Sequence, residues 1–311
     1  MSTMNRRSRA DQGMALAVCA CGMAFLLAAK APAQKTFPSP EQAAEALIDA
    51  AERFDVAVLK EIFGPDGIDL VVTEDAVQDK NTAQAFAAQA REMTTVSKDS
   101  DKAKRAILAV GSEIWPMPIP IVEERGAWRF DTKAGRQELL YRRIGSNELD
   151  AIEVCRGYVE AQHEYALTKH GSAVNQYARR IVSTPGQQDG LAWRAADGTW
   201  EGPVGEGIAR VIAEGYSDRY EPYHGYYFKI LTGQGPSAPL GAMDFIVDGA
   251  MIGGFALVAA PADYAVTGIQ TFLVSHDGVV YEKDLGSKTL ERFRAMERFD
   301  PDKSWRPVET P

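Results

Sequence analysis

The sequence predicts an α+β fold, with N-terminal helices plus a curved antiparallel sheet, then a long helix packed on an antiparallel sheet of four or five strands. Two observations predict it. Apolar residues recur at helical spacing in residues 43–62 and 147–169, whereas residues 107–130 and 226–283 hold short apolar runs bounded by turn residues. With 311 residues, 45% of them hydrophobic and 25% charged, the chain is long enough for a core in each half.

Three helices are expected before the first sheet. Ser39 can cap the first of them, Pro40 suits the first helical position, and Gln42 completes a capping box. A second, short helix is expected over residues 55–63, and a third, Ala-rich helix over residues 77–93.

The first sheet is expected to contain three strands. They cover residues 107–110, 117–122 and 127–130, and the last two are joined by a turn at residues 124–126. Pro116, Pro118 and Pro120 fall on alternate positions and have no amide N–H to donate. The second strand is therefore predicted to be an edge strand or a bulged one.

Two further helices are expected in the middle of the chain, over residues 131–143 and 147–169, with Asn147 as the cap of the second. We place a domain boundary between them, near Gly145. A helical turn over residues 174–181 and a loop-rich span over residues 185–207 follow.

The C-terminal half is predicted to be rich in strands. The expected strands cover residues 226–231, 244–247, 251–259, 268–274 and 279–283. Asp248-Gly249 between two apolar runs is a strong hairpin signal. A closing helix is expected over residues 287–298, and the Pro-rich end after it is expected to fray.

The N-terminus has the three parts of a secretory signal peptide. Three arginines within residues 6–9 precede an apolar run over residues 13–29, and Ala31-Pro32-Ala33 supplies a small-x-small cleavage site before Gln34. The alternative is an uncleaved membrane anchor, since the apolar run could nearly span a bilayer. Cleavage predicts a periplasmic or secreted protein without a stable membrane span.

Cleavage changes the charge and cysteine arithmetic. The whole chain has 34 basic and 43 acidic residues, a net charge of −9. Removing residues 1–33 takes away four basic groups and one acidic group, which leaves a net charge of −12. Such an acidic balance disfavours a nucleic-acid partner. Cys155 is then the single cysteine, and its apolar helical context favours a buried hydrophobe over a reactive thiol.

Common catalytic and cofactor motifs are absent from the sequence. No phosphate-binding loop ends in Gly-Lys-Ser/Thr, and no Gly-x-Ser-x-Gly elbow occurs. Gly233-Gln-Gly235 mimics a dinucleotide loop, but Pro236 and Pro239 forbid the helix that such a loop needs. We therefore expect a structural turn there, and no cofactor.

A metal site is not expected either. His163-Glu164 begins the zinc-protease helix pattern, but Leu167 occupies the position of the second histidine. Glu160 and His163 have the Glu-x-x-His spacing of di-iron bundles, which need a second copy that the chain lacks. Glu160, His163 and Glu164 are more simply a solvated helix face.

The remaining candidates form a hypothetical binding surface in the C-terminal half. Its residues are Tyr223, His224, Gly233, Gln234, Gly235, Asp263 and His276. Histidine could act as an acid or base near neutral pH, although turns also tolerate it for backbone reasons. The loop over residues 232–241 is expected to be a recognition surface whose backbone amides stay exposed.

Five stretches of the chain resemble a family of exported bacterial proteins classed as a domain of unknown function. They are residues 118–122, 128–131, 224–236, 251–259 and 277–286. The resemblance covers nearly the whole mature chain and implies export and one architecture along it, but no activity.

Each half also has a weaker likeness at the level of the fold. The order of capped helix, short helix and curved strands over residues 34–145 is similar to nuclear-transport-factor-2-like domains, and implies a cone-like domain. Residues 146–298 are similar to the heads of type IV pilins and pseudopilins, with residues 299–311 as a tail. Pilins carry a long apolar helix before the head, where this chain has a soluble domain. Neither likeness fixes a function.

These observations favour an exported soluble protein that acts by binding or envelope assembly, with an envelope protein or a small ligand as its partner. The alternative is a periplasmic, hydrolase-like enzyme whose site lies in the cavity of the N-terminal half. That alternative requires ionisable side chains to converge inside the cavity.

Overall fold

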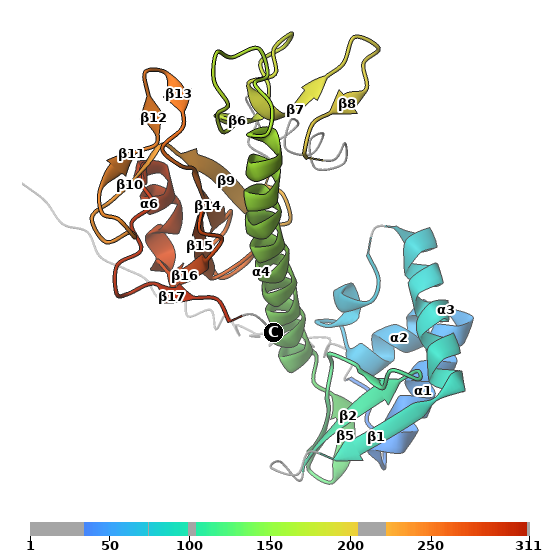
Figure 1. Cartoon of the computed structure of the whole chain (residues 1–311). Coiled ribbons are helices and arrows are strands. Elements are labelled where there is room, and N and C mark those ends of the chain that lie inside the picture. The colour runs from blue at the N-terminus through green and yellow to red at the C-terminus, as the bar shows by residue number, and fades with distance from the viewer. Residues whose placement is uncertain (1–33, 74, 99–103, 205–221, 310–311) are drawn as a thin grey trace, which may run out of the picture.

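The computed structural model describes residues 34–73, 75–98, 104–204 and 222–309, and the predicted signal peptide lies outside them. The α+β class is confirmed: helices and several antiparallel sheets are arranged around one long helix, α4 (Thr132–Tyr165). Figure 1 shows an N-terminal region at one end of α4 and a C-terminal region beside its other end. No helix among the described residues has the length and apolar character needed to cross a membrane.

The N-terminal region begins with the predicted helices. They are α1 (Pro40–Arg53), α2 (Val56–Phe63) and α3 (Ala76–Glu92), with a short 3-10 turn, η1 (Ile68–Leu70), after α2. The oxygen of Ser39 accepts a hydrogen bond from the Gln42 amide at 3.2 Å, as predicted, and the carboxylates of Asp55 and Asp75 cap the next two helices.

The N-terminal sheet has the order β1-β2-β4-β5, with β3 paired to β2. Its strands are β1 (Thr94–Lys98), β2 (Arg105–Val110), β3 (Trp115–Pro116), β4 (Ile121–Glu124) and β5 (Ala127–Phe130). The turn at Arg125 and Gly126 has positive φ at both residues, as its sequence indicates. Strand β1 was not predicted, and the strand expected over residues 117–122 is wrong in its first part, where Pro118 and Pro120 cannot donate to a ladder.

An apolar core fills this region. The rings of Phe63 and Phe130 lie 5.3 Å apart, and Ile62 and Ile121 are fully buried beside them. Gln34 joins the same core, because its Nε2 donates to the carbonyls of Ile62 (2.9 Å) and Phe130 (2.7 Å). The first described residue is therefore held in place by the N-terminal fold.

Helix α4 corrects the prediction of two helices. It runs unbroken for 34 residues, with Gly145 near its middle, and it ends at Tyr165. Asn147 is not a cap; its Nδ2 donates to the Thr267 carbonyl at 2.8 Å. A glycine inside a helix costs only about 1 kcal/mol, which such tertiary contacts can offset.

The C-terminal sheet confirms the prediction of four or five antiparallel strands packed by the long helix. Its order is β17-β16-β15-β14-β9, with β9 (Tyr226–Leu231), β14 (Ala256–Pro261), β15 (Gln270–Ser275), β16 (Val280–Asp284) and β17 (Arg306–Pro307). Helix α4 is attached by Glu148, whose carboxylate accepts hydrogen bonds from the amides of Ile269 (2.8 Å) and Gln270 (2.9 Å). Because β17 pairs with β16, the expected frayed end is wrong over those residues.

Shorter elements complete the C-terminal region. They are β6 (Arg180–Val182), β7 (Gly190–Arg194), β8 (Trp200–Glu201), β10 (Gly233–Gln234), β11 (Met243–Asp244), β12 (Ile246–Val247), β13 (Ala250–Met251), η2 (Gly286–Lys288) and α6 (Thr289–Ala295). The hairpin across Asp248-Gly249 is confirmed by the pairing of β12 with β13. The helical turn expected over residues 174–181 does not form, and the strand expected over residues 251–259 is split.

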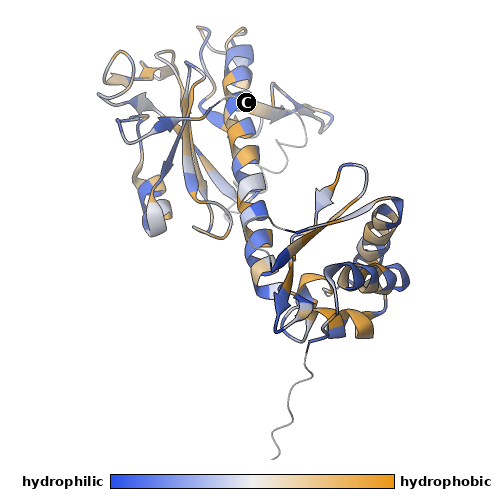
Figure 2. Ribbon diagram, turned by 90° about the horizontal axis from the view of Figure 1, so that it is seen from below, coloured by the Kyte–Doolittle hydropathy of each residue, from blue (hydrophilic) through white to orange (hydrophobic). Residues whose placement is uncertain are grey.

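Hydropathy follows this architecture. Figure 2 shows hydrophobic residues on the strands of the C-terminal sheet and within the N-terminal region, and mixed hydrophilic and hydrophobic residues along α4. A mixed helix is expected where one face packs on a sheet and another stays at the surface.

Candidate functional site

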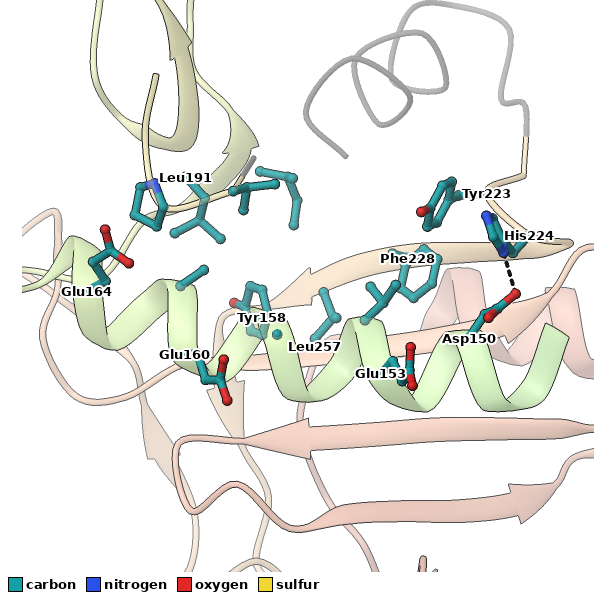
Figure 3. Close-up of a pocket in the computed structure, with 16 residues that line it drawn as sticks. Asp150, Glu153, Tyr158, Glu160, Glu164, Leu191, Tyr223, His224, Phe228 and Leu257 are labelled. Carbon is teal, nitrogen blue, oxygen red and sulfur yellow. Dashed lines mark hydrogen bonds and ion pairs between the residues drawn. The ribbon is translucent and has the colours of Figure 1, made fainter. Parts of the chain in front are cut away.

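A groove of about 500 Å³ runs along α4 in the C-terminal region. Figure 3 shows it between the helix and the segments that carry Leu191 of β7, Phe228 of β9 and the pair Tyr223 and His224. Residues far apart in the sequence therefore meet over one helix face.

The floor of the groove is made of small apolar residues of α4. Val154, Gly157 and Ala161 are spaced by three and four positions, which places them on one face of the helix. A Cβ atom added at Gly157 would meet no other heavy atom within 4 Å. Gly157 therefore presents helix backbone without a side chain to the groove.

Acidic residues of α4 line the same groove. Asp150, Glu153, Glu160 and Glu164 repeat the spacing of the floor, and Figure 3 shows them along the helix from one end of the groove to the other. Asp150 is paired with His224, but Glu153, Glu160 and Glu164 make no ion pair with any described residue. Three carboxylates without an ion pair in the described part of the chain therefore lie beside an apolar floor.

A histidine–aspartate pair lies at one end of the groove. The Nδ1 atom of His224 is hydrogen-bonded to Oδ2 of Asp150, and the rings of His224 and Tyr223 are 4.3 Å apart. Gly225 fixes the backbone next to them, because it has φ +74 and a Cβ there would lie 2.7 Å from Nδ2 of Asn147. The pair is half-exposed, so it orients the imidazole more than it stabilises the fold.

A histidine held by a carboxylate is one component of nucleophilic active sites. The described residues that line the groove include no serine, threonine, cysteine or lysine. The arrangement is suited to binding a ligand, with His224 as a hydrogen-bonding group at its end.

The family of the chain follows from a comparison along its length. A family model described as "Protein of unknown function (DUF2950)" matches residues 34–308. The chain belongs to the DUF2950 family. The predicted resemblance to a family of unknown function is therefore confirmed, whereas export stays a prediction. No curated protein and no solved structure matches the chain, so the likenesses of its halves to nuclear-transport-factor-2-like domains and pilin heads stay predictions.

In this DUF2950 protein, two of the seven predicted surface residues lie in the groove and five do not. Tyr223 and His224 line it. Gly233, Gln234 and Gly235 are instead buried in a loop that the protein uses structurally. Nε2 of Gln234 donates to the carbonyls of two residues of that loop, at 2.5 and 2.8 Å.

The expectation that the amides of this loop stay exposed is wrong for four of them. The amide of Gly235 donates to the Phe299 carbonyl, and that of Ser237 to the Asp300 carboxylate. The amides of Ala238 and Gly241 donate within the loop. Gly235 also has no room for a side chain, because a Cβ there would lie 2.3 Å from Asp300. Gly233 and Gly235 therefore serve close packing, since a Cβ at Gly233 would lie 2.6 Å from Arg298.

Asp263 and His276 lie outside the groove. Asp263 belongs to an exposed turn, where its carbonyl accepts a hydrogen bond from the Thr267 hydroxyl at 3.2 Å. The ring of His276 packs edge-on against Phe245 (6.1 Å) and Phe255 (6.2 Å). Asp263 therefore has a role in its turn, and His276 packs against aromatic rings, although its Nδ1 is buried without a hydrogen-bond partner among the described residues.

The helix face that was expected to be only solvated has further contacts in this DUF2950 protein. Glu160 and Glu164 are exposed but line the groove, and the His163 ring lies 5.4 Å from that of Phe255. Sequence reasoning missed Asp150, Glu153 and Gly157 as site residues. The repeat of acidic and small residues along one face of the helix was the signal that could have found them.

Metal and thiol chemistry find no support in the described part of the chain. No group of three or more His, Cys, Asp or Glu side chains there could hold a metal ion. Cys155 is completely buried, and burial raises the pKa of its thiol to about 12. The predicted role of Cys155 as a buried hydrophobe is confirmed.

Proposed function

We propose that this protein is an exported binding protein whose α4 groove holds a ligand that is partly apolar and positively charged. The observation that carries the proposal is the set of three carboxylates, Glu153, Glu160 and Glu164, which lack a cationic partner among the described residues and border an apolar groove. The basic, apolar and small-residue parts of residues 1–33 support export to the periplasm or beyond.

The dimensions of the groove agree with ligand binding. Its volume of about 500 Å³ lies in the range of small-ligand sites. An apolar part of the ligand would remove the surfaces of Val154, Ala161 and Leu257 from water, which is the main source of affinity in such sites. A cation would relieve the mutual repulsion of the carboxylates and would orient the ligand.

The alternative of an enzyme with a site in the N-terminal half gains no support. Among the described residues of that half, Asp79 is the one buried charged residue, and Nε of Arg105 is a further buried polar atom. The carboxylate of Asp79 accepts hydrogen bonds from the amide (2.6 Å) and hydroxyl (2.9 Å) of Thr73. The hydrogen-bonding needs of this α3 carboxylate are therefore met by the loop that precedes the helix.

A fluorescent probe of matching chemistry tests the proposal. Dansylcadaverine joins an apolar fluorophore to an ammonium group, and dansylglutamate carries the same fluorophore with negative charge. We expect dansylcadaverine alone to bind, with a blue shift of its emission. Since each exposed ion pair contributes up to about 1 kcal/mol, Glu160→Gln with Glu164→Gln should weaken binding about tenfold.

The matched control for this double variant is Glu92→Gln, which removes an exposed carboxylate at the end of α3, far from the groove in sequence and without an ion pair. It should leave the affinity unchanged. Equal binding of both probes, or equal loss of affinity in the control, would contradict the proposal.

A further inference from the structure

We infer that strand β1 is an interaction surface, and that its open edge pairs in antiparallel fashion with the same strand of a second copy of this chain. The inference does not involve the α4 groove and goes beyond the proposed binding function. Three features of β1 carry it: backbone groups that point out of the sheet, the lack of edge protection, and a sequence that is complementary to itself.

The hydrogen bonds beside β1 show which of its backbone groups point out of the sheet. Strand β1 lies at one edge of the N-terminal sheet and pairs with β2 alone among the described strands (Figure 1). Just before β1, the carbonyl of Met93 accepts a hydrogen bond of 2.9 Å from the Gly111 amide, so it points toward β2. Hydrogen-bonded and non-hydrogen-bonded pairs alternate in an antiparallel ladder. The N–H and C=O groups of Thr95 and Ser97 therefore also point toward β2.

The intervening residues of β1 point their backbone groups away from β2. These residues are Thr94, Val96 and Lys98. Strand β2 agrees with this assignment: Leu108 is opposite Val96 in the register, and its carbonyl accepts a hydrogen bond of 2.7 Å from Met117 on its other side. No hydrogen bond joins the outward groups of β1 to another described residue. The edge therefore offers donors and acceptors at the spacing of a β-ladder.

The edge formed by β1 lacks the protection that sheet edges usually have. The opposite edge of the same sheet is covered, because Phe37 exchanges hydrogen bonds of 2.7 and 2.8 Å with Trp128 of β5. Strand β1 has no proline, and its register with β2 is unbroken over all five residues, so it has no bulge. Its one charged residue, Lys98, is at its end and lies over the Trp128 ring at 5.8 Å. An edge without such protection is a template for another strand.

The sequence of β1 is complementary to itself about Val96. A two-fold axis there would place Thr95 of one copy opposite Ser97 of the other, and pairs of hydroxyl side chains stabilise neighbouring strands. It would also place Lys98 opposite Thr94, so that the two ammonium groups are about 14 Å apart along the strands. The outward backbone groups match as well, because three residue pairs would exchange about six hydrogen bonds.

The pairing belongs to the weak, reversible class of contacts. Five residues on each strand bury less surface than a stable complex, which needs roughly 1,200 Å² or more. We therefore expect monomers and dimers to exchange, with dimers abundant only at high protein concentration. A cross-link that traps the dimer is the sharpest test.

Single cysteines test the register of the pairing. The experiment uses the full-length chain with Cys19→Ser and Cys21→Ser, which leaves the buried Cys155 as the one native thiol. In Val96→Cys, two thiols would face each other across the axis, with Cα atoms about 5.5 Å apart and within the range of a disulfide. We expect mild oxidation of this variant to give at least tenfold more covalent dimer than oxidation of its parent, measured on non-reducing gels.

Thr95→Cys and Ser97→Cys are the matched controls. Two copies of either variant would hold their thiols at diagonal positions, with Cα atoms about 7–8 Å apart, which is too far for a disulfide. Neither should cross-link alone, whereas an equal mixture of the two should, because Thr95 is opposite Ser97 of the other copy. Cross-linking of either control alone as fast as Val96→Cys overturns the inference.

A proline tests the contact without a cross-link. Val96→Pro removes an N–H that points out of the sheet and keeps the hydrogen bonds between β1 and β2, and edge strands tolerate proline at such positions. We expect sedimentation equilibrium up to about 1 mM to show a dimer of the wild type, and a dissociation constant at least tenfold higher for Val96→Pro. The cysteine variants decide the question if this proline lowers the melting temperature.

Two results of the sedimentation experiment would overturn the inference. A wild type that stays monomeric over this range would leave the edge to a strand of another protein. A dimer that a folded Val96→Pro variant leaves unchanged would place the contact elsewhere on the molecule.

Discussion

The two regions joined by α4 differ in how completely they enclose their interiors. In the N-terminal region, helices and sheet close around an apolar core that contains Phe63 and Phe130. In the C-terminal region the sheet covers one side of α4, and another face borders the groove. Buried polar groups are also more frequent there; Gln162 is fully buried and hydrogen-bonded to both backbone groups of Ala178. The difference indicates that the face of α4 that borders the groove is the place to look for a bound ligand.

The largest expected effect comes from two core substitutions, which test whether the two regions unfold as one cooperative unit. Phe255 is fully buried and contacts the rings of Tyr158, His163, Tyr177 and His276. Phe255→Ala should lower the free energy of unfolding by about 3–5 kcal/mol, and so should Phe130→Ala in the N-terminal region. Because α4 belongs to both regions, we expect both variants to shift one common transition in urea, followed by circular dichroism.

Two separate transitions, each moved by only one of the variants, would show that α4 does not couple the regions. The comparison would then become one between two independent domains. A single transition would show that the two regions unfold together, so that the N-terminal region helps to stabilise the C-terminal one.

A medium effect compares two glycines of the same helix. A Cβ at Gly135 would lie 2.6 Å from the Ile119 side chain and 3.1 Å from its Cα atom, whereas Gly145 faces open space. Gly135→Ala should destabilise the protein by about 1–3 kcal/mol through overpacking. Gly145→Ala should stabilise it by about 0.5–1 kcal/mol through helix propensity. Urea midpoints measure both, and equal shifts would mean that α4 is not pressed against the N-terminal region at Gly135.

The smallest effect concerns an exposed ion pair between α4 and the N-terminal region. Arg136 donates two hydrogen bonds of 2.8 Å to Asp69, which holds the pKa of that carboxyl below its ordinary value of 3.8. A lowered folded pKa means that the contribution to stability is complete above the ordinary value and is lost as the pH falls through the folded one. The urea midpoint of Arg136→Met should therefore be below that of the wild type at pH 6, and the two should converge near pH 2. Lys133→Met, which removes an exposed charge on the same turn, should show no such convergence.

Local signals predicted much of the fold because their physical causes are local. The cap at Ser39 and the Asp-Gly hairpin at residues 248–249 depend on the conformation of a few neighbouring residues. The continuity of α4 was missed because Gly145 suggests a break, and the contacts that keep the helix intact, such as Asn147 with Thr267, come from 120 positions away. Strand β1 was missed because its residues are mostly polar and exposed, so it lacks the alternation that marks a half-buried strand.

The groove was harder to predict than the elements that form it. Its acidic residues are regularly spaced on one helix, but the same spacing is typical of a solvated face. Only the return of residues 203–204 and 223–228 over α4 turns that face into a groove. The sequence therefore indicated which residues share a face, and tertiary structure decided what that face borders.

The docking of Gln34 would have a chemical consequence in a chain cleaved at the predicted site. Cleavage after Ala33 would give Gln34 a free α-amine, and an amino-terminal glutamine can lose ammonia when that amine attacks its own Cδ atom. The ring so formed has no primary amide, so the hydrogen bonds from Nε2 to Ile62 and Phe130 would be lost. In a chain cleaved there, the fold would oppose this cyclisation and keep the glutamine open.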